Sequence, residues 1–164
     1  FMIPVGLSSA ISIRVGNALG RGEPEAARYA GRIGLLIVFL FQTVSAIAMF
    51  LFPELIVRIY TDDVAVGTLA VSLLFYAAIF QYPDGVQMVM AGALRGYKDT
   101  RMPMVYTIVA FWIVGMTLGY TLTFNRGMGP AGMWIGMIGG LTVASVLMLR
   151  RFHHTSNKEI VGAT

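Results

Sequence analysis

Hydrophobic and polar positions alternate along this chain in long blocks, not in the short periods of a soluble domain. Five apolar blocks, separated by short connections rich in charged residues, glycine and proline, cover about residues 1–19, 33–52, 64–94, 104–124 and 131–149. A helix needs about 20 mostly apolar residues to cross the hydrocarbon core of a bilayer. The pattern therefore predicts an all-α, polytopic transmembrane bundle with five spans.

The first block is shorter than a span. Only residues 1–13 precede Arg14, and the chain starts with Phe1 without the basic segment and cleavage site of a signal peptide. We interpret the sequence as a fragment whose missing beginning contains at least one more span.

Composition agrees with a membrane protein. The chain is 57% hydrophobic and only 12% charged, with a mean hydropathy of +0.74, which is too apolar for a soluble domain of 164 residues. The absence of cysteine excludes disulfides, thiol catalysis and cysteine metal sites.

The basic residues are distributed unevenly between the two ends of the predicted helices. Of the twelve Lys and Arg, four lie in residues 14–32, three in 95–101 and three after residue 149, which leaves Arg58 and Arg126 on the other side. Basic loops stay in the cytoplasm. The asymmetry predicts cytoplasmic basic loops and a cytoplasmic C-terminus, and it explains the net charge of +4 without nucleic-acid binding.

Asp84 is the most informative residue, because it places a carboxylate about halfway along the third apolar block. A charged side chain at that depth costs between about 3 and 10 kcal/mol. Pro83 cannot donate a backbone hydrogen bond, which frees a carbonyl one turn earlier, near Ile79. We predict an ion- or proton-binding switch here. The alternatives are a buried salt bridge of structural importance and a Pro-Asp-Gly turn between two segments.

Other polar and soft side chains are candidates for the same site. Gln81 and Gln87 lie three residues either side of Asp84, within reach on a helix. Gln42, in the middle of the second block, suits a hydrogen bond between helices better than a transport path. Met88 and Ala91 would supply apolar cavity wall near Asp84, with aromatic residues such as Tyr106 and Trp112.

Two sets of glycines predict close helix packing. Gly115 and Gly119 lie four residues apart in the fourth block, and Gly132, Gly136 and Gly140 repeat the spacing in the fifth. Small residues at this spacing let helix backbones approach closely in membranes.

Several enzyme classes fit poorly. An intramembrane aspartyl protease needs two carboxylates, whereas Asp84 is the one acid within a predicted span. His153 and His154 are adjacent in a basic tail that we expect to be solvated, so they project differently and do not predict a metal site. The glycines at 16, 20 and 22 lack the Lys-Ser/Thr ending of a phosphate-binding loop.

Three stretches together resemble one transporter family. They are PVGLSSAISIRVGNALGRG (residues 4–22), GALRGYKDTR (92–101) and MGPAGMWIG (128–136). The chain resembles the C-terminal half of multidrug and toxic compound extrusion (MATE) transporters of the NorM-like branch.

The resemblance implies helices eight to twelve of a twelve-helix transporter with two lobes, in the inner membrane of a bacterium. It also implies a cation-coupled (Na⁺ or H⁺) multidrug antiporter that exports organic cations, is no enzyme and needs no cofactor. Asp84 takes the position of the family's coupling carboxylate and of a Na⁺ ligand. The proposed site also includes Gln81, Tyr82, Gln87, Met88 and Gln42.

The resemblance has one departure and one alternative. Phe80 occupies the position where family members often carry a tyrosine, so one hydroxyl ligand is missing, and Tyr82 lies on another helix face. The expected partners are the N-terminal lobe, small cationic drugs and the bilayer. A related flippase for lipid-linked precursors is the alternative.

Overall fold

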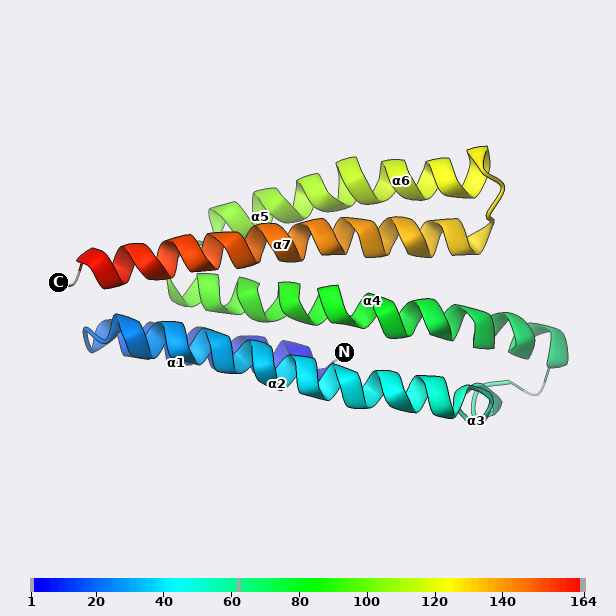
Figure 1. The fold of residues 1–164 in the computed structure, drawn as a ribbon, viewed down its shortest axis with the longest axis horizontal. Helices are drawn as coiled ribbons and strands as arrows, with labels where there is room; N and C mark the ends of the chain where they lie inside the picture. The colour runs from blue at the N-terminus through cyan, green and yellow to red at the C-terminus, as the bar shows by residue number, and fades with distance from the viewer. Residues whose placement is uncertain (1, 62, 163–164) are drawn as a thin grey trace.

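The computed structural model describes residues 2–61 and 63–162, which form helices joined by short connections (Figure 1). The elements in chain order are α1 (Met2–Gly20), α2 (Pro24–Leu51), α3 (Pro53–Arg58), α4 (Val64–Gly96), α5 (Arg101–Ile108), η1 (Val109–Gly115), α6 (Met116–Tyr120), η2 (Thr121–Asn125) and α7 (Pro130–Gly162). The π-helical segments η1 and η2 continue α5 and α6 without interruption. Within the described ranges, five helical stretches are long and apolar enough to cross a membrane, as predicted.

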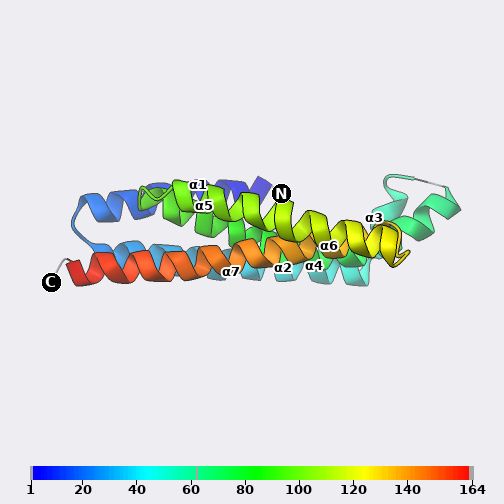
Figure 2. The ribbon, with the colours of Figure 1, turned by 90° about the horizontal axis from the view of Figure 1, so that it is seen from above.

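Helix α4 is the centre of the bundle, with α1, α2 and α7 packed around it. In the perpendicular view, α1 and α5 lie on one side of the molecule and α2 and α7 on the other (Figure 2). The core between α1, α2 and α4 contains small and medium apolar side chains, among them Val15, Val38 and Val89. The α5–η2 hairpin arm packs mainly on α7.

Helix α4 runs unbroken through Pro83, so the alternative of a Pro-Asp-Gly turn is wrong. It begins at an N-cap, because Asp63 Oδ1 accepts hydrogen bonds from the backbone N–H groups of Ala65 (2.8 Å) and Val66 (3.1 Å). The predicted loop from Pro53 to Asp63 contains the short helix α3. Asp62, which lies in the same connection, is outside the described residues.

The glycine pattern predicted from the sequence forms the contact between α6 and α7. A Cβ on Gly136 would overlap the backbone of Gly119, and one on Gly140 would lie 2.8 Å from the Ala110 carbonyl oxygen. The two helices therefore touch backbone to backbone, as small residues at four-residue spacing allow.

The C-terminal segment differs from the prediction. The span was expected to end at residue 149 and to be followed by a solvated basic tail, but α7 continues as helix to Gly162. Phe152 is buried there, with its ring 6.0 Å from that of Tyr97 and over Gly31 of α2. Arg151 Nε also donates to Asp99 Oδ2 at 2.7 Å. These contacts hold the segment against α2 and the α4–α5 connection, while His153 and His154 are exposed.

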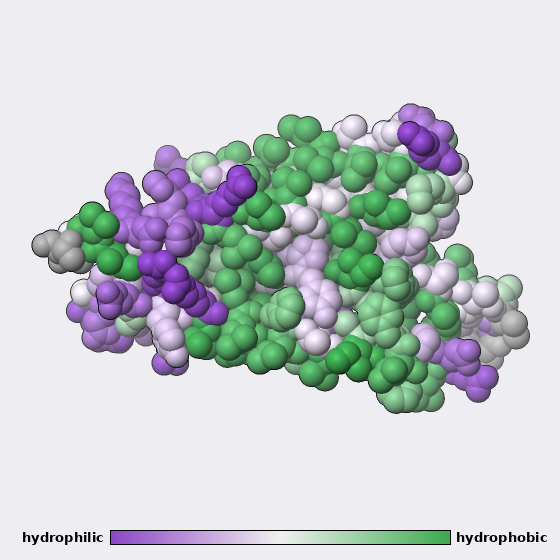
Figure 3. All heavy atoms as spheres, in the orientation of Figure 1, coloured by the Kyte–Doolittle hydropathy of each residue, from purple (hydrophilic) through white to green (hydrophobic). Residues whose placement is uncertain are grey.

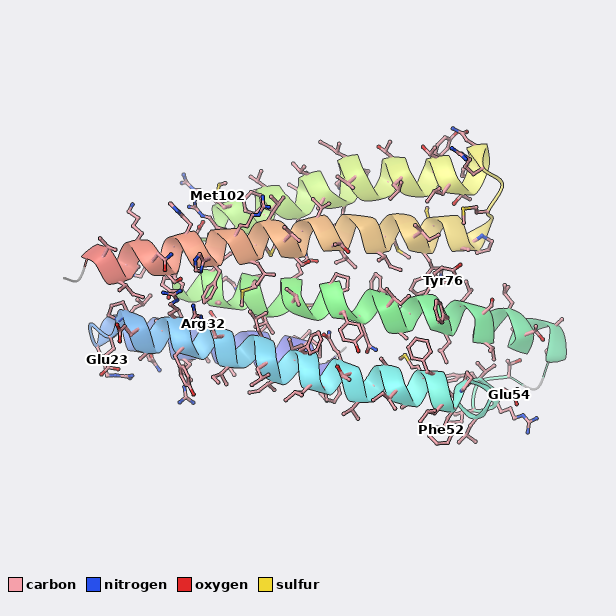
Figure 4. The ribbon with its side chains drawn as sticks, in the orientation of Figure 1. Glu23, Arg32, Phe52, Glu54, Tyr76 and Met102 are labelled. Carbon is pink, nitrogen blue, oxygen red and sulfur yellow. The ribbon has the colours of Figure 1, made fainter. Side chains whose placement is uncertain are left out.

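Polar residues gather at the two ends of the molecule, and apolar residues form the band between them (Figure 3). Figure 4 labels Glu23, Arg32 and Met102 near one end, and Phe52 and Glu54 near the other. The end with Arg32 includes the α1–α2 connection, the α4–α5 connection and the C-terminal part of α7. The three basic segments therefore lie together, as five alternating spans require.

Candidate functional site

Asp84 lines a cavity of about 400 Å³ between α4, α5 and α7. Its walls come from α4 (Asp84, Gln87, Met88, Ala91 and Arg95), from the α4–α5 connection and the arm that follows it (Thr100, Pro103, Met104, Thr107 and Phe111), and from Met148 of α7. The cavity is mainly apolar, with a few polar groups along α4. This is the usual composition of a small-molecule site.

The Asp84 side chain is half-buried. Within residues 2–61 and 63–162, no salt bridge or side-chain hydrogen bond involves its carboxylate. A half-buried carboxylate without such a partner has its full capacity to attract a cation from the cavity. Its position does not fit the interpretation of Asp84 as half of a structural salt bridge within the described part of the chain.

Gln87 lines the same cavity. Its Nε2 lies 3.5 Å from Thr107 Oγ1, a long hydrogen bond, and Thr107 Oγ1 donates in turn to the Pro103 carbonyl at 2.8 Å. Gln87 Oε1 is buried and has no hydrogen-bond partner in the described chain. Carboxylate and amide oxygens are the ligands that hard cations prefer, so the chemistry of Asp84 and Gln87 suits cation ligands.

The other polar candidates do not line this cavity, and two of them, Gln42 and Tyr82, join α2 to α4. Gln42 is buried, and its Nε2 donates to the Gln81 carbonyl oxygen. The Gln81 side chain donates to the Ala78 carbonyl of its own helix at 3.3 Å. The Tyr82 hydroxyl donates to Thr43 Oγ1 at 3.3 Å, and its ring lies 5.3 Å from that of Phe39. The structure thus brings Asp84, Gln87 and Met88 together and leaves Gln42, Gln81 and Tyr82 outside their cavity.

The contact from Gln42 depends on a glycine of α4, Gly85. A Cβ on Gly85 would overlap the Gln42 amide, so only glycine admits this side chain beside the α4 backbone.

Arg95 was assigned to the basic loop by sequence reasoning, but it lines the Asp84 cavity. Its Nη2 donates to Ser8 Oγ at 2.9 Å, and Ser8 Oγ donates to the Met88 carbonyl at 2.6 Å. Ser8 thus links the Arg95 guanidinium to the Met88 carbonyl by two successive hydrogen bonds, one helical turn from Asp84. Residues 8 and 95 are far apart in the chain, so no local sequence signal indicates this contact.

The aromatic candidates lie elsewhere. Trp112 is 69% exposed, and Tyr106 packs half-buried against the core; neither lines the cavity. The aromatic wall comes from Phe111. Phe80 packs on Trp134 of α7, with ring centroids 5.7 Å apart.

Comparison with known proteins identifies the family. The MatE family model matches residues 1–121. A probable multidrug resistance protein NorM from Xanthomonas axonopodis pv. citri is 53% identical over 96% of this chain, and multidrug resistance protein PmpM from Pseudomonas aeruginosa is 40% identical over 98% of it. In each case the chain spans only 34% of the relative's length.

Solved structures agree on the fold. The eukaryotic MATE transporter AtDTX14 superimposes with a TM-score of 0.86 at 22% identity, over 99% of this chain and 37% of the other. An inward-facing multidrug resistance MATE transporter superimposes with a TM-score of 0.85 at 18% identity, over 95% of this chain and 36% of the other. The chain belongs to the MATE family, whose members are transporters and not enzymes.

Proposed function

We propose that this chain is part of a cation-coupled multidrug antiporter, in which Asp84 binds the coupling ion and the organic cation in turn. The observation that carries the proposal is the half-buried Asp84 carboxylate in an apolar cavity, without an ion-pair partner in the described chain. Relatives named as multidrug resistance proteins support the class of cargo. The N-terminal lobe of the same transporter would complete the path.

The proposed exchange follows from competition for one carboxylate. Na⁺ or H⁺ and an organic cation each neutralise Asp84, so binding of one weakens binding of the other. Gln87 Oε1 supplies a neutral second ligand for Na⁺, and Met88 and Phe111 supply apolar wall for the cargo. Entry of the coupling ion displaces the drug when the cavity faces outward.

The proposed orientation places the basic end in the cytoplasm of a bacterial cell, with the protein in the inner membrane. The clustering of basic residues at one end of the helices supports this orientation. A flippase for lipid-linked precursors would need room for a lipid tail beside the carboxylate, and a cavity of about 400 Å³ suits a drug-sized cargo better.

The test is Asp84→Asn in the full-length transporter, measured as extrusion of a fluorescent organic cation under imposed Na⁺ and pH gradients. The amide keeps the size of the carboxylate but cannot be neutralised by a cation, so we expect gradient-driven efflux to disappear while expression and thermal unfolding stay normal.

Asp63→Asn is the matched control, because it also replaces one carboxylate, and Asn caps a helix as well as Asp does. Its efflux should equal that of the parent protein. Undiminished, gradient-dependent efflux by a well-folded Asp84→Asn protein would refute the proposal. Misfolding of that variant alone would favour a structural role.

A further inference from the structure

A second pocket lies at the basic end of the molecule, on the side opposite α1 and α5. It has a volume of about 480 Å³ and is lined by Glu25, Ala26, Arg28, Tyr29 and Arg32 of α2 and by Ile160 of α7. Polar atoms gather over this end in the space-filling view, and Arg32 is labelled there (Figures 3 and 4). The pocket exists because α7 remains helical beyond residue 149 and supplies the opposite wall.

The two arginines have no ionic partner in the described chain. Arg28 and Arg32 are one turn apart on α2, so their guanidinium groups project to the same side. Neither forms a salt bridge within residues 2–61 and 63–162, and Arg28 Nε is buried without a hydrogen-bond partner there. A buried, unpaired guanidinium nitrogen costs free energy unless an anion or water meets it.

The face below the arginines is apolar and exposed. Leu36 and Leu40 continue the four-residue spacing of Arg28 and Arg32 towards the middle of the helix, and they are 53% and 57% exposed. Tyr29, 66% exposed, lies beside the basic pair at the level where aromatic residues meet lipid headgroups. A phosphate at the arginines would contact positive charge, and a hydrocarbon chain along the leucines would contact apolar side chains.

We propose that this pocket binds the headgroup of an anionic phospholipid. Arg28 and Arg32 donate charge-assisted hydrogen bonds to the phosphate, a geometry for which the planar guanidinium is well suited. One acyl chain lies along Leu36 and Leu40. Glu25 is exposed and lines the same pocket, so its negative charge weakens the attraction of the two arginines for a phosphate. The proposal is independent of the role of Asp84.

The test uses the purified full-length transporter in an uncharged detergent and two probes with identical acyl chains, phosphatidylglycerol and phosphatidylcholine. Native mass spectrometry counts the lipids bound and gives their apparent affinities. We expect phosphatidylglycerol to be retained preferentially. The double variant Arg28→Gln/Arg32→Gln should lose about tenfold or more in affinity for it, because two charge-assisted hydrogen-bond donors are removed.

The matched control is Arg14→Gln/Arg150→Gln, which removes two exposed arginines from the same end of the molecule. It should keep the preference. Equal weakening by the two pairs would show only general attraction to basic charge and would overturn the proposal. Equal retention of the two lipids by the parent protein would overturn it too.

Further measurements distinguish binding of a lipid from binding of a free anion, and loss of the site from loss of folding. Inorganic phosphate should not displace phosphatidylglycerol at millimolar concentration, and Leu36→Ser/Leu40→Ser should weaken the long-chain lipid more than a short-chain one. Displacement by phosphate, or no chain-length effect, would overturn the lipid assignment. If the arginine variant unfolds, Glu25→Gln tests the site instead, because it keeps both arginines. It should bind phosphatidylglycerol more tightly than the parent protein does. Unchanged affinity for phosphatidylglycerol would overturn the proposal.

Discussion

The two sides of helix α4 around Pro83 carry similar polar side chains and use them differently. On the α2 side, Gln42 and Tyr82 donate hydrogen bonds between helices, although the Gln42 side-chain oxygen is buried without a partner in the described chain. The Gln81 amide is bonded within α4. On the cavity side, Asp84 and the oxygen of Gln87 lack hydrogen-bond partners in the described chain. The two sides therefore differ chiefly in Asp84, whose carboxylate has no hydrogen-bond or ion-pair partner in the described chain, whereas the side-chain donors on both sides are bonded to protein.

The largest effect on the packing side is expected from Gly85→Ala. The added Cβ overlaps the Gln42 amide, so we expect a loss of about 1–3 kcal/mol in unfolding free energy. Unfolding of the purified transporter in detergent measures it. Gly6→Ala, in α1, has no atom within 4 Å of its added Cβ and is the control. Gln42→Ala combined with Gly85→Ala should recover part of the loss; strictly additive losses would contradict the contact.

On the cavity side, Gln87→Leu should weaken binding of the coupling ion about tenfold and leave stability nearly unchanged, because it removes one neutral ligand and leaves Asp84 in place. The ion dependence of drug efflux measures the change. Gln81→Leu removes the same group from the other side of Asp84 and should leave ion binding as it was. A larger effect of Gln81→Leu would reverse our assignment of the two sides.

Tyr82→Phe should act on stability alone. It removes the hydroxyl that donates to Thr43 at 3.3 Å, worth about 0.5–1.5 kcal/mol, while the ring keeps its contact with Phe39. A double-mutant cycle with Thr43→Val isolates this hydrogen bond. A change in ion affinity with unchanged stability would place Tyr82 in the transport path instead.

The smallest effect is expected from Arg95→Gln. Its guanidinium lines the Asp84 cavity but the residue is exposed, so solvent screens its charge. Removing it should strengthen cation binding by about threefold, and the effect should shrink as salt rises. Weaker cation binding in Arg95→Gln would show that Arg95 organises the cavity more than it repels the ion.

The sequence was sufficient for the number of spans and for the glycine contact between α6 and α7, because both depend on spacing along one helix. It could not decide which amide faces the cavity. Gln81 and Gln87 flank Asp84 symmetrically, at about 60° to either side of it, so their order is fixed only by where α2 and α5 pack.

Two other features escaped prediction for physical reasons. Arg95 and Ser8 meet through tertiary packing, which leaves no local pattern. The C-terminal continuation of α7 did leave one, since Met148, Phe152 and Ser156 recur every four residues and are buried. Charged residues stand between them, so the mean hydropathy of the segment is low although one face of the helix is buried.

The direct contact between Gly119 and Gly136 also bears on how the cavity can change its width. Helices that interlock without intervening side chains have no rotamers to rearrange, so sliding of one past the other is strongly opposed. The α5–α7 hairpin should therefore move as one body. Because α7 itself packs closely on α4, the part of the hairpin free to change the width beside Asp84 is the α5 end, where Thr107 meets Gln87 at 3.5 Å.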